Sequence, residues 1–264
     1  MRLRLPRSRR RYPEENAPPP PRVLILTPMK DARRTLPVYW SLLRRVTYPR
    51  GRISLGFLES DSSDGTWDEV QACLPVLQRE FRRALAWKRD FGYRIPPGLP
   101  RWEDSIQLAR RAVLARSRNH LLFHALDDED WVLWMDADLL DYPPDVIERL
   151  LAVGRDVVQP HCVLQYGGPT YDRNAWVDQG RSHMDRLRDH DLVRLDSVGG
   201  TMLLVKADLH RDGLIFPPFL YGLDNPLVRR GRGEIETEGL GSLAHDMGIE
   251  CWGLPNLEVL HHPF

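Results

Sequence analysis

The sequence predicts an α/β fold with a mostly parallel central sheet and helices on both of its faces. Short apolar runs at 22–28, 53–60 and 131–134 lack polar alternation, which is typical of strands buried on both faces. Helical patterns separate these runs, and alternation of strand and helix indicates a parallel sheet covered on both sides. A chain of 264 residues, 42% of them hydrophobic, is long enough for one core of this kind.

The first half of the chain shows the alternation most clearly. The expected elements, in order, are a strand at 22–28, a helix at 35–45, a strand at 53–60, a helix beginning near Thr66, a strand at 84–89, a helix at 105–126 and a strand at 131–138. Leu36, Tyr39 and Leu43 share one face of the first helix. Ile106 and Val113 belong to an apolar stripe on the long helix, so both helices are expected to pack on the sheet.

The second half is less regular. Its expected elements are a helix at 144–153, a strand at 156–160, a strand at 197–205, a loop at 216–233, a helix at 236–247 and a final strand ending at His261. Pro144 is placed as a first-turn proline, where its missing N–H costs nothing. No internal repeat is present in the sequence.

Residues 1–21 form a basic, proline-rich segment that is expected to be a disordered tail. Six arginines stand in its first eleven residues, and a proline run follows them. Like charges repel and prolines lack backbone donors, so a packed structure is not expected here. The alternative is an arm that contacts anionic lipid or a partner protein. A single domain is expected at 22–264.

Composition excludes several classes of protein. Lys plus Arg and Asp plus Glu number 37 each, so bulk charge does not favour a nucleic-acid partner. No apolar run approaches the roughly 18 residues of a membrane span, and the N-terminus lacks a signal-peptide pattern. Cys73, Cys162 and Cys251 are widely separated and match no zinc motif. We therefore expect buried thiols in a reducing, cytoplasmic compartment.

The segment WVLWMDADLLD carries the strongest chemical signal. Asp136 and Asp138 follow the apolar strand, and residues two apart in extended chain point to the same side. Ligands of open α/β sheets lie beyond the carboxyl ends of strands. Two adjacent carboxylates repel each other unless a cation lies between them, and hard divalent ions prefer oxygen ligands. The pattern predicts a metal site, although a turn with paired aspartates is the alternative.

Two further segments suggest a nucleotide site. Asp61 and Asp64 lie in a turn after the strand at 53–60, where they can accept hydrogen bonds from a base or ribose or simply cap the next helix. The long helix carries Arg116 within a run of arginines. Arginine presents a fork that suits phosphate, and the alternative is a solvated basic face.

The second half offers candidates for the acceptor side and for a third metal ligand. Gly199 and Gly200 precede a strand and would let a sugar approach the backbone, unless they form a bulge. Glu236 and Glu238 open a helix, where they are either functional or cap the helix dipole. His261 ends the last strand and could offer a neutral imidazole to the metal.

These segments together resemble glycosyltransferase family 62, the fungal mannan polymerase subunit family of α-mannosyltransferases, which has the GT-A fold. The matching segments are ILTPMKDA (25–32), VTYP (46–49), LGFLESDSSDGT (55–66), KRDFG (88–92), RRAVLARSRNHLL (110–122), WVLWMDADLLDYP (131–143), YDRNAW (171–176), VGGTMLLVKADLHRDGLIFPP (198–218), ETEGLGSLAHDMG (236–248) and GLPNLEVLH (253–261). They follow the order of the family along the whole expected domain.

The resemblance implies a GDP-mannose donor, a Mn²⁺ (or Mg²⁺) ion and retention of anomeric configuration. It implies a nucleotide-binding half at 22–141 and an acceptor-binding half at 142–264. The residues that it assigns to the metal are Asp136, Asp138 and His261. The residues that it assigns to the donor are Thr27, Pro28, Asp31, Asp61 and Arg116, with Asp64 and Asp136 beside them, and to the acceptor side Gly199, Gly200 and Glu236–Glu238.

The late helix bears on how the reaction proceeds. Inverting relatives of this fold often have Glu-Asp at its start, and the Asp takes the proton of the acceptor. Here Thr237 follows Glu236, and a hydroxyl is no base near neutral pH. The expected route is therefore retaining, and the leaving phosphate accepts the proton. Asp138 is expected to hold the metal, and Arg116 is expected to provide a fixed charge in a site of low dielectric. Glu238 is the alternative base.

Other functions stay open at this point. One alternative is an inverting GT-A transferase that uses another nucleotide sugar, and another is a non-catalytic nucleotide-binding subunit. A sugar-nucleotide pyrophosphorylase is disfavoured because LTPMKDARR lacks the glycines of its loop. Fungal family members carry a membrane anchor and a lumenal stem, which this sequence does not show. The expected location is therefore the cytoplasm, and the Golgi lumen is the alternative if the chain has been trimmed of its anchor. A glycan or small hydroxyl acceptor and a homo- or hetero-oligomer are also expected.

Overall fold

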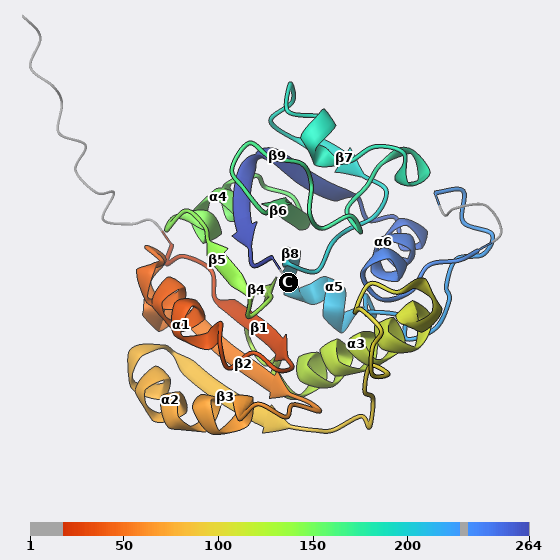
Figure 1. Ribbon diagram of the computed structural model, residues 1–264. Helices are drawn as coiled ribbons and strands as arrows, with labels where there is room; N and C mark the ends of the chain where they lie inside the picture. Colours follow the sequence, from red (N-terminus) through yellow and green to blue (C-terminus); the bar gives the residue numbers. More distant parts are fainter. Residues whose placement is uncertain (1–17, 228–231, 264) are drawn as a thin grey trace, which may run out of the picture.

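The computed structural model describes residues 18–227 and 232–263 (Figure 1). Most of the expected tail at 1–21 therefore lies outside the described residues. The strands are β1 (Val23–Met29), β2 (Ile53–Glu59), β3 (Arg83–Lys88), β4 (Trp131–Met135), β5 (Leu139–Asp141), β6 (Val157–Val163), β7 (Val193–Leu195), β8 (Met202–Lys206) and β9 (Cys251–His261). The helices are α1 (Leu36–Arg45), α2 (Thr66–Glu80), α3 (Asp104–Ala125), α4 (Val146–Ala152), α5 (Ala207–Arg211) and α6 (Glu236–Asp246).

One sheet joins these strands in the order β3-β2-β1-β4-β8-β6-β9-β5, and β7 pairs with β9. The four strands β3, β2, β1 and β4 are parallel, with α1, α2 and α3 as the connections between them. Beyond β4 the sheet is mixed, because β8 runs antiparallel to both β4 and β6, while β6 and β9 are parallel. The expected fold class is confirmed, and the parallel character is concentrated in the first half.

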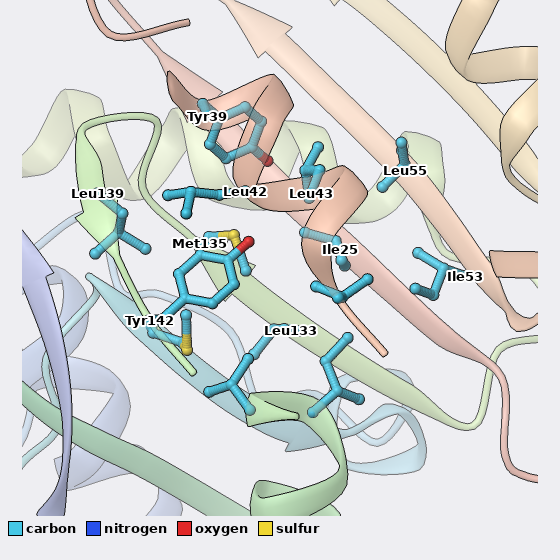
Figure 2. Packing of buried hydrophobic residues seen from close by; sticks show 14 of the residues in the cluster. Ile25, Tyr39, Leu42, Leu43, Ile53, Leu55, Leu133, Met135, Leu139 and Tyr142 are labelled. Atoms are coloured by element: carbon cyan, nitrogen blue, oxygen red, sulfur yellow. The ribbon is translucent and has the colours of Figure 1, made fainter. Parts of the chain in front are cut away.

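Helices cover both faces of the sheet. On one face, α1, α2 and α4 contribute to a core around Ile25, Tyr39 and Leu133, which are all buried (Figure 2). On the other face, α3, α5 and α6 pack around Trp134 and Leu240. Burial of large apolar side chains stabilises the fold by about 25 cal/mol for each Å² removed from water. Both cores stop at the carboxyl ends of β1, β2 and β4, where the polar side chains gather.

The structure corrects two expected boundaries. The helix expected at 144–153 begins at Val146, so Pro144 is not a first-turn proline. The Pro144 carbonyl instead accepts a bond from the Thr47 N–H, 2.9 Å away. The strand expected at 197–205 begins at Met202, because the N–H groups of Gly199 and Gly200 bond to the side chains of Gln159 and Asp172 rather than to a strand.

The pairing of β5 with β9 positions the end of the chain. Leu139 of β5 lies opposite His261 of β9, and the His262 N–H donates to the Asp138 carbonyl across 2.9 Å. These bonds bring the last strand beside the end of β4, although more than a hundred residues separate them in sequence. In the described part of the chain, no helix combines the length and apolarity that crossing a membrane requires.

Candidate metal and nucleotide site

Three predicted metal ligands meet where β4 ends. One ligand atom from each of Asp136, Asp138 and His261 lies within 4.8 Å of the other two. Asp136 and Asp138 follow β4 directly, and His261 arrives on β9. Carboxylate oxygens and an imidazole nitrogen at this spacing suit a divalent ion such as Mn²⁺ or Mg²⁺.

The imidazole of His261 is oriented by bonds at both ring nitrogens. Its Nδ1 donates to the His262 carbonyl at 2.8 Å, and its Nε2 lies 3.0 Å from Asp138 Oδ1. Burial would lower the pKa of His261, but the bond to Asp138 and the nearby carboxylates outweigh burial and raise it. Burial likewise opposes ionisation of Asp138, yet His261 holds the pKa of that carboxyl below its usual range. The pair favours the charged forms when no metal is bound.

Asp136 has a different environment. Burial raises the pKa of its carboxyl to about 6, and the positive charge of Arg118 opposes that rise. Arg118 Nη2 lies 3.3 Å from Asp136 Oδ1. Carboxylates held close together repel one another, so a cation between Asp136 and Asp138 would relieve the cost of ionising both.

A cavity of about 400 Å³ opens beside these carboxylates. Loop 93–103, the carboxyl ends of β1 and β2, and one face of α3 form its walls. Its lining residues include Pro28, Asp31, Asp61, Asp136 and Asp138 among the predicted ones, together with Lys30, Arg101, Arg110, Ser117 and Arg118. The size is within the range of small-ligand sites, and the mixed charges suit a polar, anionic ligand such as a nucleotide.

Asp31 and Asp61 shape the floor of this cavity. Both have positive φ, 48° and 56°, a conformation that few residues other than glycine adopt. The Asp61 carboxylate accepts the N–H groups of Phe91 and Gly92, each at 2.9 Å. Asp31 Oδ1 accepts the N–H of Ser63 at 2.8 Å. These carboxylates fix the turns that face the cavity, which leaves part of their acceptor capacity for a ligand.

Thr27 and Asp64, which were predicted for the donor, and the two glycines that were predicted for the acceptor side lie outside the lining. Thr27 Oγ1 is buried and bonds to the Tyr39 hydroxyl at 2.5 Å. Asp64 accepts the N–H groups of Arg33 and Thr66, so it ties the turn before α2 to the loop after β1. The N–H groups of Gly199 and Gly200 bond to the side chains of Gln159 and Asp172, and the Gly200 carbonyl lies 3.4 Å from Arg118 Nη2. The structure does not bring these groups into the cavity beside Asp61.

Arg116 is the clearest correction. It was expected to be a fixed charge at low dielectric, but it is exposed on α3, with its guanidinium 5.8 Å from the ring centroid of Phe91. Arg118, two residues later, is only 5% exposed and reaches Asp136. The sequence places both arginines on one helix, and only the packing of α3 against α6 decides which is buried.

Glu236 and Glu238 are buried in ion pairs at the start of α6. Glu236 Oε1 lies 3.0 Å from Arg118 Nε, and Glu238 Oε2 lies 2.5 Å from Arg111 Nη1. Burial alone would raise the pKa of Glu236, but Arg118 and Arg111 lower it. The lowered pKa keeps Glu236 ionised, and a carboxylate held ionised in this way is a weak base.

The space beside Gly199 and Gly200 is filled by neighbouring side chains rather than left open. A Cβ on Gly199 would lie 2.1 Å from Asp172 Oδ2, and one on Gly200 would lie 2.4 Å from Arg118 Nη2. Asp172 was not singled out from the sequence. Its Oδ2 accepts bonds from Gly200 N–H and from the Thr201 hydroxyl, which fixes the turn before β8.

Comparison with known proteins decides the family. The family model Anp1 matches residues 11–185 and 177–220. The chain belongs to the Anp1 family. It is 33% identical to the mannan polymerase complex subunit mnn9 of Schizosaccharomyces pombe, over 91% of this chain and 80% of that protein. It is 30% identical to the mannan polymerase complex subunit MNN9 of Candida albicans, over 91% of this chain and 74% of that protein.

Solved structures confirm the GT-A fold of this Anp1 family member. The mannosyltransferase PcManGT from Pyrobaculum calidifontis, solved in complex with GDP-Man and Mn²⁺, superposes with a TM-score of 0.57 and 17% identity. The match covers 91% of this chain and 56% of that one. The resemblance to the fungal mannan polymerase family, which the sequence motifs indicated, is thus confirmed, together with the glycosyltransferase fold.

Proposed function

We propose that this Anp1 family member is a metal-dependent mannosyltransferase that transfers mannose from GDP-mannose to a hydroxyl acceptor with retention of configuration. The observation that carries the proposal is the meeting of Asp136, Asp138 and His261 at the edge of the cavity. The GDP-mannose donor is supported by the names of the relatives and by the ligand of PcManGT.

The three candidate metal ligands, Asp136, Asp138 and His261, fit Mn²⁺. Two carboxylates and one imidazole offer hard and intermediate ligands, which suit Mn²⁺ or Mg²⁺ better than softer metals. The bond of His261 Nδ1 to the His262 carbonyl leaves Nε2 as the ligand atom, an arrangement typical of metal-binding histidines. When bound, such an ion stabilises negative charge on the departing diphosphate as a Lewis acid.

The residues around the cavity would then bind and orient the donor. Lys30, Arg101 and Arg110 line the cavity with positive charge, which favours a diphosphate. Asp31 and Asp61 hold the turns that would face the nucleoside.

The proton of the acceptor is the other half of the mechanism. Glu236 and Glu238 are each paired with an arginine, and neither is presented as a base. Retention follows if the leaving phosphate oxygen accepts the proton on the same face of the sugar where the acceptor attacks. The buried ion pairs of α6 therefore support the retaining route that the Glu236-Thr237 sequence suggested.

Assembly with other chains is a separate proposal. The relatives are described as subunits of mannan polymerase complexes, which supports a hetero-oligomeric state for this chain as well. Mass measurement by light scattering, alone and after co-expression with a second member of the family, tests it. A monomer in both preparations would contradict the proposal.

Transfer assays test the proposed function. With Mn²⁺ present, GDP-mannose should be consumed and UDP-sugars should not, and the anomeric configuration of the product, read by NMR, should be α. Asp138→Ala should abolish turnover and Mn²⁺ binding while leaving the circular dichroism spectrum unchanged. Asp156→Ala is a matched control, because Asp156 is exposed and paired with Lys206 far from the site. Turnover of UDP-sugars alone would overturn the donor assignment.

A further inference from the structure

The guanidinium of Arg118 is held from several sides but is not fully satisfied. Its Nε donates to Glu236 at 3.0 Å, and its Nη2 lies 3.3 Å from Asp136 Oδ1 and 3.4 Å from the Gly200 carbonyl. Its Nη1 is buried and has no hydrogen-bond partner among the described residues. Buried polar groups in folded proteins are almost always bonded, so an unpartnered arginine nitrogen calls for an explanation.

The surroundings of Arg118 fix its position. The guanidinium carbon lies 5.3 Å from the ring centroid of Phe216 and 5.7 Å from that of Trp134. Gly200 leaves the space that the guanidinium occupies, since a Cβ there would lie 2.4 Å from Nη2. Arg118 also lines the cavity beside Asp136 and Asp138. An immobilised cation with a free donor at this place suits an anionic group of a ligand.

Glu236 bonds to Nε of the Arg118 guanidinium, and the backbone of Glu236 is itself strained. Its φ is 60°, a left-handed conformation that a glutamate rarely adopts. Its N–H donates to the Pro217 carbonyl at 2.9 Å, and its side chain, only 4% exposed, bonds through its carboxylate to Arg118. Strained conformations of this kind persist where the surroundings over-determine them, and they cluster at functional sites.

We infer that Arg118 binds the β-phosphate of the nucleotide donor through its Nη1, and that Glu236 is the positioning residue that aims this guanidinium. The inference rests on the proposed function for the presence of a nucleoside diphosphate. It assigns to Arg118 the role that the sequence suggested for Arg116. It also gives the buried Glu236 a purpose that does not require it to act as a base.

Nucleotides that differ by one phosphate test the inference. Binding of GDP and of GMP, each with Mn²⁺, is measured by calorimetry for the wild type, Arg118→Gln and Arg118→Lys. Loss of a charged hydrogen bond should weaken GDP about 10- to 100-fold in Arg118→Gln and GMP less than about threefold. Lysine keeps the charge without the fork, so the loss for GDP should be intermediate. A purely structural role would weaken both nucleotides equally.

Further variants separate positioning from contact. Glu236→Gln keeps the shape of the side chain and should weaken GDP about 3- to 10-fold with Mn²⁺ affinity unchanged. Arg116→Gln tests the residue that the sequence favoured, and Arg149→Gln is a surface control on α4. Circular dichroism confirms that each variant is folded, and Arg118→Lys serves if Arg118→Gln does not fold.

The possible results are distinguishable from failure of the proposed function. The inference is overturned if the folded Arg118 variants bind GDP within about twofold of the wild type, or if they lose GDP and GMP alike. It is also overturned if Arg116→Gln, rather than the Arg118 variants, loses GDP. If the wild type binds neither nucleotide, the donor class of the proposed function is wrong and the inference falls with it.

Discussion

The ring of Tyr171 lies against the imidazole of His261, with the two centroids 4.6 Å apart and the planes inclined by 36°. Tyr171 follows β6 in the chain, and its N–H donates to the Cys162 carbonyl at 2.9 Å, which fixes its backbone to the sheet. The imidazole is therefore held by a carbonyl at Nδ1 and by an aromatic face across the ring. Groups that orient a metal-binding histidine affect affinity nearly as much as the ligands do.

We expect Tyr171→Ala to weaken Mn²⁺ binding about 10-fold, because the His261 ring would lose the surface that orients it. Tyr171→Phe keeps the ring and should stay within about threefold of the wild type. Electron paramagnetic resonance of Mn²⁺ during titration measures both affinities. Tyr221→Ala is the matched control, since Tyr221 bonds to Asp246 on α6. Equal affinities for Tyr171→Ala and the wild type would show that the stacking does not position His261.

The binding of Mn²⁺ should depend on pH in a defined direction. The pKa of Asp136 is raised to about 6 by burial, and the pKa of His261 is raised mainly by its bond to Asp138, against the effect of burial. Protons therefore compete with the metal at both ligands as the pH falls. Because burial raises the folded-state pKa of Asp136, ionising this carboxyl destabilises the metal-free fold, and its stability falls as the pH rises from 3.8 through about 6.

The expected result is that Mn²⁺ raises the melting temperature clearly at pH 7.5 and hardly at all at pH 5. Above pH 6 the ion neutralises carboxylates that would otherwise repel each other. Differential scanning fluorimetry with and without Mn²⁺ across this range measures the effect. A thermal shift that is the same at pH 5 and pH 7.5 would contradict the assignment of Asp136 as a ligand.

The part of the site that the sequence predicted is the part that local pattern determines. A run of apolar residues from Trp131 to Trp134 specifies a buried strand, and carboxylates directly after it must lie at the edge of the sheet. His261 could be assigned only through the family resemblance. The pairing of β5 with β9 brings His261 beside Asp138, and no residue close to His261 in the sequence predicts that pairing.

Other features depend on packing between distant segments. Arg116 and Arg118 have similar sequence surroundings on α3, and the position of α6 decides that Arg118 is buried. The positive φ of Glu236 leaves no mark in the sequence. The strands β5 and β7 have three residues each, too few to show a period of two. Prediction therefore succeeded for the parallel half of the sheet and was weaker where the sheet is mixed.

The glycines before β8 give a test of packing. Gly199→Ala should destabilise the fold by about 2 kcal/mol, since a Cβ would lie 2.1 Å from Asp172 Oδ2 and displace the carboxylate that fixes the turn. Gly51→Ala is the control, because a Cβ there meets nothing within 4 Å, and its stability should change by less than about 1 kcal/mol. Urea denaturation measures both. Comparable stability of the two variants would mean that the Asp172 turn relaxes freely.

The last prediction concerns His210, which packs beside β4 on the face opposite to α1. Its Nε2 accepts the indole N–H of Trp134 at 3.2 Å, and its Nδ1 donates to the Leu214 carbonyl. The ring is therefore neutral, with the proton on Nδ1. Burial lowers its pKa from 6.5 to about 4, although the bond to the Leu214 carbonyl opposes this. Protonation of Nε2 would break the bond to Trp134 and place a charge in the core.

Because the folded-state pKa of His210 is depressed, its contribution to stability is present above pH 6.5 and is lost as the pH falls toward 4. The loss is about 3 kcal/mol between these limits. His210→Gln can still accept from Trp134 but cannot titrate, so it should be about 1 kcal/mol less stable than the wild type at pH 7.5 and lose less stability on acidification. His190→Gln is the control, because His190 is exposed. Urea denaturation at pH 7.5 and pH 4.5 measures the slopes, and identical acid losses in wild type and His210→Gln would show that His210 does not set them.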